Sequence, residues 1–459
     1  MNNYSFQFGE EYQGYWNIPF IGENIPGTLH IEKHIIHLDL FWNQYSGIGK
    51  AELPTATGYA YTKDNKTCYH FTLYELFRTH ASSFGERQSQ FSFEVAHFTI
   101  SDTKNIIKDN IKSLCIRTRL LDKWVYDYTR NSFNYNIPAD NTESMKFEYK
   151  PKRSLTLYKT EDMRVNIFFG YGETTPSYSG FSMTTRAFLN VDFKNTISFD
   201  KAFCISEYLI WLFALIWNNK FCPDFVAYRT KEYEFINKQS DRYSYKYHDN
   251  QSANISTDIS DISAEQLSSI IGEWIEFIDN YNDPLNTFFE TLFNGHLSPL
   301  SVIKNHIFTI DGLSAEFRGK SNGQIKEGKR KKELDDILKK IEAGLDKVEI
   351  SKDDFNKLKT AALGESNKTL KERFSCLLET IKDYVNLDIE EQFCDKVINT
   401  RNHFTHLKGK AEEMYPKTQF WELSQCLEKI ISSFILNSIG VEPATARKIV
   451  RKITMKDEK

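Results

Sequence analysis

The prevailing spacing of the apolar residues changes near position 260 of this 459-residue chain. Before that point apolar and polar residues alternate in short runs, for example at 27–31 and 36–40. Successive side chains of a strand point to opposite faces, so this alternation predicts β-strands. Beyond it apolar residues recur every three or four positions, which predicts helices. The sequence therefore predicts an α+β protein, with a β-rich domain over 1–260 and an all-α helical bundle over 261–459.

The same patterns predict individual elements. The expected strands cover 27–31, 36–40, 68–73, 91–100, 147–158, 165–171, 187–193 and 221–233. A single helix, 199–217, interrupts them. The expected helices of the second region, after a first one beginning at 263, cover 284–294, 299–318, 331–344, 352–363, 368–386, 388–406, 418–439 and 442–453. Pro284 and Pro299 are expected in first turns, after the N-caps Asp283 and Ser298, and Gly440 is expected to end a helix.

Composition and charge exclude several classes of protein. Hydrophobic residues make up 40% of the chain and charged residues 26%, which is ordinary for a soluble globular protein. The net charge of −4 gives no global basic footprint, so any contact with RNA has to come from a local patch. The seven cysteines show no CxxC spacing, and the first residues lack the features of a signal peptide. We therefore expect a cytoplasmic protein without a membrane segment.

Three histidines, His30, His34 and His37, have a spacing that would cluster on a helix and suggest a metal site. The local alternation instead predicts two strands joined by a turn at 32–34. In that arrangement His37 would lie on the opposite face from its two neighbours. We therefore expect no metal site at these histidines.

One short segment, RNHFTH at 401–406, places a cation, an amide and imidazoles within two helical turns. Arg401 can form a forked contact with phosphate oxygens, and His406 can move protons near neutral pH. Asn402 lies one helical turn before His406 and would stack with it. Such a set can cleave RNA without a metal. The alternative is that the arginine and the histidine only complement the dipole at the C-terminal end of the helix.

The context of this segment matters, because an arginine followed by a histidine five to seven positions later is expected about once by chance. A second match, Arg242 to His248, lies in a polar, tyrosine-rich segment without a helical period, which we interpret as a loop or an edge strand. Arg401 instead continues an apolar row on one side of the expected helix, and solvation alone explains this poorly. The row consists of Ile389, Phe393 and Val397.

The run FCDKVINTRNHFTH at 393–406 resembles the signature helix of HEPN ribonucleases. More narrowly, the whole chain resembles the Apea-like HEPN proteins of bacterial antiviral defence. The further segments that carry this resemblance are LSAEFR at 313–318, LKERFSCLL at 370–378, Tyr15-Trp16, 27–29 and 121–124. Ser314 and Ala315 weaken the match around Glu316, so Glu316 is carried over only as a supporting residue.

The resemblance implies that 1–260 is an Apea-like domain that senses or regulates, and that 261–459 is a HEPN nuclease. It implies a metal-independent endoribonuclease of anti-phage, abortive-infection defence, without a cofactor and with a phage-encoded protein as a trigger. The targets would be single-stranded RNA loops, among them tRNA anticodon loops. The enzyme would act as a homodimer, or as a higher even-numbered oligomer, because two motif helices would build one composite site.

The resemblance also assigns roles to residues. His406 would be the general acid or base, Arg401 would stabilise the phosphorane, and Asn402 would orient the phosphate or His406. His403 would be either a second imidazole of the site or a structural residue. The basic residues that could follow an RNA backbone are Lys408, Lys410, Arg447 and Lys448. A non-catalytic HEPN scaffold, whose N-terminal domain binds a ligand or a protein, is the alternative.

Overall fold

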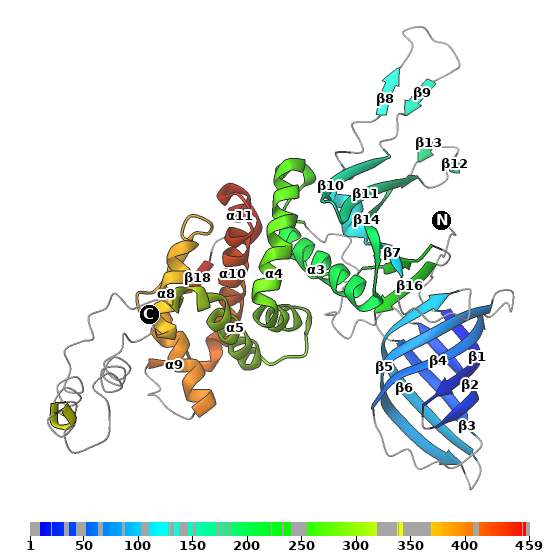
Figure 1. Ribbon diagram of the computed structural model, residues 1–459, viewed down its shortest axis with the longest axis horizontal. Coiled ribbons are helices and arrows are strands. Elements are labelled where there is room, and N and C mark those ends of the chain that lie inside the picture. Colours follow the sequence, from blue (N-terminus) through cyan, green and yellow to red (C-terminus); the bar gives the residue numbers. More distant parts are fainter. Residues whose placement is uncertain are drawn as a thin grey trace. The chain divides into compact units, whose positions relative to one another are not determined.

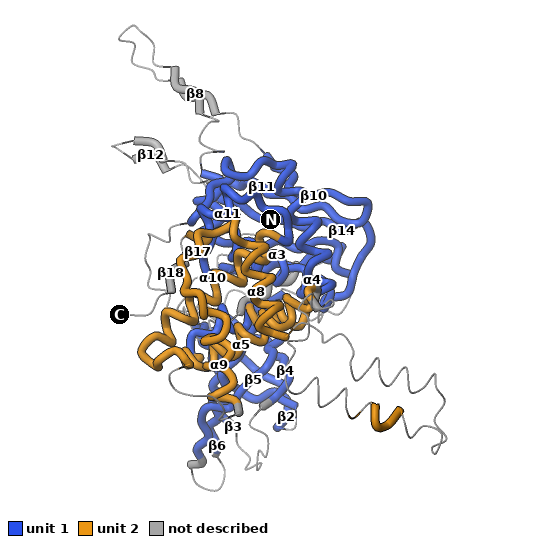
Figure 2. The backbone as a smooth tube through the Cα atoms, turned by 90° about the vertical axis from the view of Figure 1, so that its left-hand side faces the viewer, with its two compact units in different colours: residues 1–280, 289–296, 438–449 blue, residues 281–288, 297–437, 450–459 orange. Residues whose placement is uncertain are grey.

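The computed structural model (Figure 1) describes residues 10–19, 21–31, 36–42, 52–62, 68–84, 88–101, 110–126, 128, 133–136, 146–149, 153–171, 175–177, 180–182, 185–221, 223–231, 234–239, 255–318, 337, 339–342, 369–406, 413–451 and 453–455. The chain separates into two compact units, coloured blue and orange in Figure 2. Unit 1 comprises 1–280, 289–296 and 438–449, and unit 2 comprises 281–288, 297–437 and 450–459.

The first strands of unit 1 form a closed antiparallel sheet, drawn in blue in Figure 1. Strand β6 (Gln88–Ser101) pairs with both β3 and β5 and so closes the ring. The other strands of the ring are β1 (Glu10–Ile18), β2 (Gly22–Ile31), β3 (Ile36–Trp42), β4 (Glu52–Thr62) and β5 (Cys68–Phe84). Alternate side chains, such as Leu29, Leu38 and Phe93, point inward and are fully buried, which confirms the prediction from alternation.

Trp16 fits inside the closed sheet because two glycines make room for its indole. Trp16 is fully buried, and its cross-strand partner in β4 is Gly58. A Cβ at Gly58 would overlap the indole of Trp16. A Cβ at Gly27 of β2 would press on the same indole and on the main chain of Asp39. Close approach of this kind is a common reason for glycine within a strand.

From β6 the sheet continues through six further antiparallel strands, in the order β16, β15, β7, β14, β11 and β10. Their bounds are β7 (Ile111–Arg117), β10 (Ser154–Lys159), β11 (Met163–Tyr171), β14 (Thr185–Ile197), β15 (Phe225–Arg229) and β16 (Glu234–Gln239). Two small hairpins stand apart from this sheet: β8 (Phe133–Asn136) with β9 (Lys146–Tyr149), and β12 (Thr175–Ser177) with β13 (Gly180–Ser182). The prediction of one strand over 147–158 was wrong, since β9 and β10 belong to different sheets. Pro151 lies between them and has no N–H for a sheet ladder.

Helix α3 (Phe199–Trp217) matches the predicted helix 199–217 and packs in the core of unit 1. Its Trp217 meets Trp124 of α1 (Arg119–Trp124) edge-on, with ring centroids 6.0 Å apart. The indole N–H of Trp274, in the first half of α4, donates a hydrogen bond to the carbonyl of Tyr208 in α3 at 2.8 Å. Among the described helices, none has both the length and the apolar character that a membrane crossing requires.

The prediction that a helix begins at Pro284 was wrong. Helix α4 runs from Ala264 to Phe293 and contains Pro284, with a kink at Tyr281, where φ is −129° and ψ is 31°. Proline cannot donate to the carbonyl one turn earlier, so the helix bends before it instead of ending. Asp283 is therefore a helical residue and not an N-cap, and its carbonyl accepts a hydrogen bond from the hydroxyl of Thr287 at 3.1 Å.

Unit 2 is built from helices. Its described helical elements after α4 are α5 (Pro299–Leu313), the 3-10 turn η3 (Ser314–Arg318), α8 (Leu370–Thr380), α9 (Phe393–His406), the 3-10 turn η6 (Lys417–Gln419) and α10 (Phe420–Ser438). Ser298 caps α5 by accepting from the N–H of Ser301 at 3.2 Å, as predicted. Gly440, with φ of +75°, follows α10 and confirms the predicted helix end. The expected helix 352–363 lies outside the described residues.

The predicted helix 388–406 begins later than expected, at Phe393. Residues before it form the short strand β17 (Leu387–Ile389), which pairs in parallel with β18 (Ile453–Met455). Ile389 lies opposite Met455 in this pair, so it belongs to a strand and not to the helix. A pairing with a strand so far along the chain leaves no periodic signal in the local sequence.

Candidate active site

Helix α9 carries the whole 401–406 segment at its C-terminal end. Phe393 and Val397, two turns and one turn before Arg401, are 1% and 0% exposed and anchor the helix in unit 2. Arg401 continues this row but is only half-buried. The predicted apolar row is therefore confirmed for Phe393 and Val397 and wrong for Ile389.

Arg401 and Asn402 are joined side chain to side chain. Nη1 of Arg401 donates a hydrogen bond to Oδ1 of Asn402 at 3.0 Å, and both side chains are half-buried. This bond orients the guanidinium and uses one of its five N–H donors. A guanidinium held in this way is suited to a forked contact with phosphate oxygens.

The structure describes the side chain of only one of the two histidines of the segment. His406 is the last residue of α9, and its side chain lies outside the described residues. The ring of His403 meets that of Phe404 edge-on, with centroids 4.9 Å apart. Nδ1 of His403 is buried, and the described part of the chain offers it no hydrogen-bond partner. The catalytic role of His406 and the choice of roles for His403 stay predictions.

A second cation reaches the end of α9 from another helix. Nζ of Lys304, in α5, donates to the carbonyl of Phe404 at 3.2 Å. The last carbonyls of a helix have no partner within the helix and carry partial negative charge, so an ammonium stabilises them. Sequence reasoning missed Lys304, because its contact joins residues 100 positions apart. No local pattern could have indicated it.

A polar cluster fixes the turn of α9 that precedes Arg401. Thr400 is fully buried, and its hydroxyl donates to the carbonyl of Lys396 at 2.6 Å and accepts from the N–H of Tyr415 at 3.1 Å. The hydroxyl of Tyr415 donates to Glu390 at 2.5 Å, and the same carboxylate pairs with Nζ of Lys396 at 2.7 Å. These bonds tie α9 to the segments before and after it. The backbone that carries the motif is thereby held in one position.

The segments 313–318 and 370–378 also meet in unit 2. Arg373 of α8 is 8% exposed, and its Nη1 donates to the carbonyl of Asp311 at 2.9 Å and to the hydroxyl of Ser314 at 3.1 Å. Its Nη2 donates to the carboxylate of Asp311. Sequence reasoning missed Asp311. Glu316 lies in η3, but its side chain is outside the described residues, so its supporting role stays a prediction.

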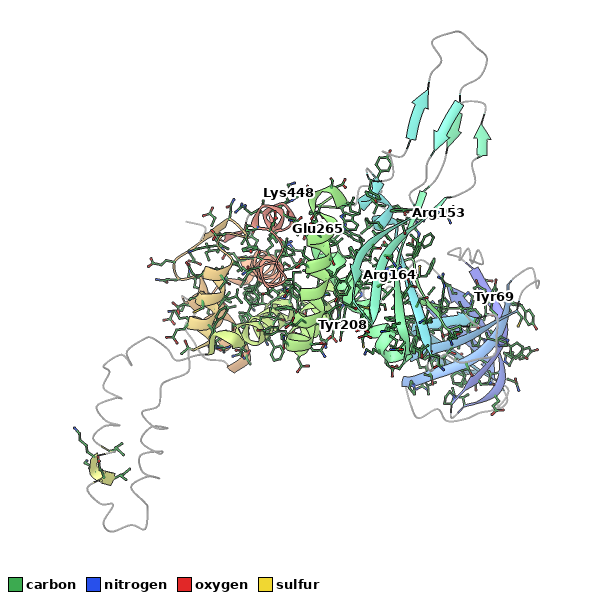
Figure 3. All side chains as sticks on the ribbon, turned by 45° about the horizontal axis from the view of Figure 1, so that its top comes forward. Tyr69, Arg153, Arg164, Tyr208, Glu265 and Lys448 are labelled. Atoms are coloured by element: carbon green, nitrogen blue, oxygen red, sulfur yellow. The ribbon has the colours of Figure 1, made fainter. Side chains whose placement is uncertain are left out.

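The basic candidates for RNA binding are only partly described. Lys408, Lys410 and the rival pair Arg242 and His248 lie outside the described residues. Arg447 and Lys448 lie in α11 (Pro443–Val450), which belongs to unit 1, whereas the motif belongs to unit 2. Lys448, labelled in Figure 3, forms an ion pair with Asp261 at 2.6 Å. Hydrogen bonds from the main chain of Asp258 and from Lys448 lower the pKa of the Asp261 carboxyl. A contact of Arg447 or Lys448 with RNA stays a prediction.

The prediction that His37 faces away from His30 was wrong. The two residues lie directly opposite each other in the β2–β3 pair, and their rings stack with centroids 4.4 Å apart. Counting positions along the chain failed because the turn reverses the direction of the second strand. Paired residues of neighbouring strands share a face whatever their separation in sequence. His34 lies outside the described residues.

Family models match both parts of the chain. The model of the Apea-like HEPN domain matches residues 305–445, which include α5, α8 and the motif helix α9. The model of ApeA N-terminal domain 1 matches residues 11–290, more than half of the chain. No curated protein and no solved structure was found to match. The α+β fold and the family resemblance seen in the sequence are both confirmed, and the chain belongs to the ApeA family, with ApeA N-terminal domain 1 followed by an Apea-like HEPN domain.

Proposed function

We propose that this protein is a metal-independent endoribonuclease of anti-phage defence, acting by abortive infection, with its site at the C-terminal end of α9. The observation that carries the proposal is the bond from Arg401 to Asn402, on a helix that buried contacts hold in place. HEPN domains are in general ribonucleases, so the match over 305–445 supports the same chemistry.

In the proposed reaction the 2′-hydroxyl of a ribose attacks the adjacent phosphate, and the 5′-oxygen of the next nucleotide leaves. The products are a cyclic phosphate and a 5′-hydroxyl. His406 transfers the protons, Arg401 stabilises the negative charge of the phosphorane, and Asn402 orients the phosphate or the imidazole. Because Arg401 is already held by Asn402, less conformational freedom is lost when the phosphate binds.

The substrate in this proposal is RNA in a single-stranded loop, with tRNA anticodon loops as the narrower choice. In-line attack needs a flexible backbone, which a loop provides and a duplex does not. Lys304 supports an RNA substrate, because its ammonium lies at the carbonyl of Phe404 beside the motif and can contact a backbone phosphate. Lys408, Lys410, Arg447 and Lys448 are proposed as further backbone contacts.

The site is proposed to be composite. Two copies of α9 from two protomers would together supply the groups for one cleavage, so the active form is a homodimer or a higher even-numbered oligomer. Residues 1–260 would sense a phage-encoded trigger, and residues 261–459 would cleave. The family match to ApeA N-terminal domain 1 supports separate roles for the two regions.

The test is cleavage of single-stranded RNA by the purified protein in the presence of a chelator. Arg401→Ala and His406→Ala should each lose cleavage, while the products of the unchanged protein should carry cyclic phosphate ends. His403→Ala, in the same helix, tests whether the imidazole of His403 is also needed for cleavage. His296→Ala is the matched control, since His296 is an exposed histidine of unit 1.

The same variants should be challenged with phage in cells, where a natural trigger is present. Protection should disappear with Arg401→Ala and with His406→Ala, and new RNA ends with 5′-hydroxyl groups should appear only with the unchanged protein. Full protection by both variants would instead favour a non-catalytic scaffold whose N-terminal domain binds a ligand or a protein.

A further inference from the structure

We propose that the outer face of the closed sheet holds a binding site for a divalent transition metal ion of the Zn²⁺ class, with His30, His37 and Asp39 as ligands. The site lies in ApeA N-terminal domain 1 and involves none of the residues of the 401–406 segment. It is therefore independent of the proposed nuclease activity.

The register of the sheet places the ligands on one face. Glu11 of β1 lies opposite His30 of β2, His30 lies opposite His37 of β3, and His37 lies opposite Glu94 of β6. Two imidazoles thus stand between two carboxylates in one line across four strands. Asp39 follows His37 by two residues in β3, so its side chain points to the same face.

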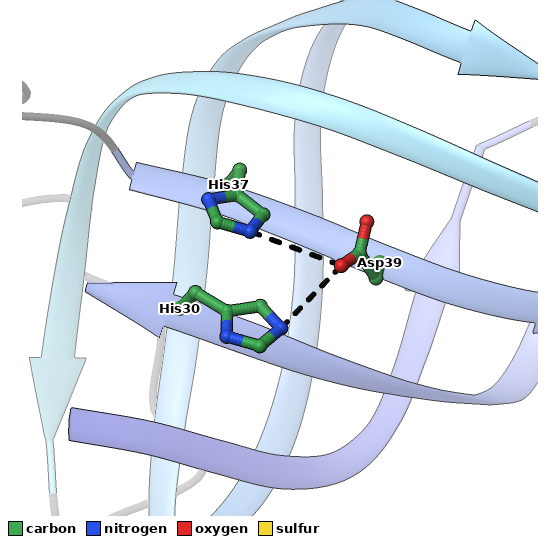
Figure 4. Close-up of side chains that lie close together, drawn as sticks. All are labelled: His30, His37 and Asp39. Atoms are coloured by element: carbon green, nitrogen blue, oxygen red, sulfur yellow. Dashed lines mark ion pairs between the residues drawn. The ribbon is translucent and has the colours of Figure 1, made fainter. Parts of the chain in front are cut away.

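The distances suit a metal with short bonds. Oδ2 of Asp39 lies 3.4 Å from Nε2 of His30 and 3.8 Å from Nε2 of His37. Dashed lines mark these two pairs in Figure 4. One ligand atom from each of the three residues lies within 4.8 Å of the others. Ligands bound at about 2.0–2.1 Å in a tetrahedron are about 3.3–3.4 Å apart. The two rings stack nearly parallel, at an interplanar angle of 14°, so both have to turn about their side-chain bonds before their Nε2 lone pairs meet at one ion and complete three corners of such a site.

Neighbouring groups lie beside two of the three ligands, and one of them holds Asp39 by a hydrogen bond. The hydroxyl of Ser92 donates to Oδ1 of Asp39 at 2.5 Å, and it is Oδ2 of Asp39 that lies nearest both imidazoles. Oε1 of Glu11 lies 3.6 Å from Nδ1 of His30, on the other side of that ring from Asp39. A carboxylate at Nδ1 favours the tautomer whose Nε2 lone pair is available to a metal. A metal-binding histidine usually donates its other N–H to such a carboxylate, and Glu11 would have to approach by about half an ångström to accept it.

The ligand types select the class of metal. Two imidazoles and one carboxylate suit Zn²⁺ and its neighbours Co²⁺, Ni²⁺ and Cu²⁺, whereas Mg²⁺ and Ca²⁺ prefer oxygen ligands. The side chains of His30, His37 and Asp39 are 23%, 30% and 24% exposed, so an ion can enter from solvent and keep a water as its fourth ligand. A bound ion would cross-link β2 and β3 on the surface of the sheet.

The test is calorimetric titration of the full chain with Zn²⁺ alone, after chelator treatment and removal of the chelator. The unchanged protein should bind one equivalent of Zn²⁺. His30→Gln and His37→Gln should each weaken the affinity of this site for Zn²⁺ by at least about 100-fold. Ser92→Ala should weaken the same site by about 10- to 100-fold, because it removes only the support of Asp39. His296→Ala removes an exposed histidine outside the closed sheet and should leave the site unchanged.

A second readout does not depend on affinity. Co²⁺ at the site should give the intense visible absorption of a four-coordinate ion, and the band should vanish in His30→Gln and in Asp39→Asn. Circular dichroism checks that each variant keeps its fold, which is expected because all three positions lie on the solvent side of the strands. Absence of a saturable site in the unchanged protein, or equal Zn²⁺ binding by folded His30→Gln and His37→Gln, would overturn the proposal and leave an ion-pair cluster.

Discussion

Arg373 of α8 and Asp311 of α5 form an ion pair in which the guanidinium is almost fully buried and the carboxylate is 40% exposed. The same guanidinium donates to the main-chain carbonyl of Asp311, so one side chain binds both the backbone and the carboxylate at the end of α5. Helix α5 also carries Lys304, which contacts the motif helix α9. The ion pair therefore helps to determine where this cation meets the motif.

Replacing Asp311 should destabilise the HEPN domain. Asp311→Ala leaves the buried guanidinium of Arg373 without its carboxylate but with its bonds to the carbonyl of residue 311 and to Ser314. We expect a loss of about 2 kcal/mol in the free energy of unfolding, measured with urea. Lys371→Ala in the same helix is the control. Lys371 pairs with Asp395, and the two side chains are 52% and 44% exposed. Loss of this exposed ion pair should lower the free energy of unfolding by less than about 1 kcal/mol. Equal losses in the two variants would contradict the structural role of Arg373.

Removing Lys304 should weaken the binding of RNA to a similar extent for all RNA sequences. Lys304→Ala removes one cation at the end of α9, and the slope of log affinity against log salt should decrease by about 1. The measurement uses the Arg401→Ala/His406→Ala background, so that RNA is bound but not cleaved. Lys382→Ala is the matched control, because Lys382 is an exposed lysine that pairs with Glu379. An unchanged slope in Lys304→Ala would show that this ammonium only caps the helix.

A composite site predicts that inactive subunits suppress active ones. Subunits that carry Arg401→Ala and His406→Ala would form mixed dimers, and mixed dimers should not cleave. With nine inactive subunits for each active one, and random pairing during coexpression, RNA cleavage should fall to about one tenth. Subunits that each hold a complete site would keep their full activity under the same conditions, which would rule the composite site out.

The N-terminal domain should lose stability in acid because of one buried histidine, His97. His97 stacks on Tyr74 with centroids 4.6 Å apart, and burial lowers the pKa of His97 to about 4. The unfolded chain binds this proton near pH 6.5, so the stability due to neutral His97 is full above pH 6.5 and is lost as the pH falls towards 4. The expected loss is about 3 kcal/mol in the free energy of unfolding.

His97→Phe keeps a ring in the stack but cannot take up the proton. Its free energy of unfolding should therefore fall less between pH 7 and pH 4.5 than that of the unchanged protein, as measured with urea at both values. The carboxylates titrate in both proteins, so the difference between them isolates His97. Parallel losses in the two proteins would mean that His97 is not protonated on unfolding.

Local patterns were sufficient for elements that bury one face. Helix α3 follows the predicted range 199–217, and strands β2 and β3 include the predicted ranges 27–31 and 36–40. Capping residues were equally informative at the start of α5, where Ser298 is the N-cap that the sequence predicts. At Pro284 the same rule failed, because α4 tolerates the proline by a kink at Tyr281. Proline forbids one hydrogen bond, and packing decides whether the helix ends or bends.

The sequence by itself determined the two-part α+β fold, the family and the 401–406 segment, because periodicity and motif spacing are properties of neighbouring residues. Tertiary structure alone decided the contacts that join distant residues: Lys304 with Phe404, Arg373 with Asp311, and the parallel pair that moves the start of α9 to Phe393. It also placed His30 and His37 on one face, although their spacing predicts opposite faces. The physical reason is that the register between strands, and not the count along the chain, determines which side chains meet.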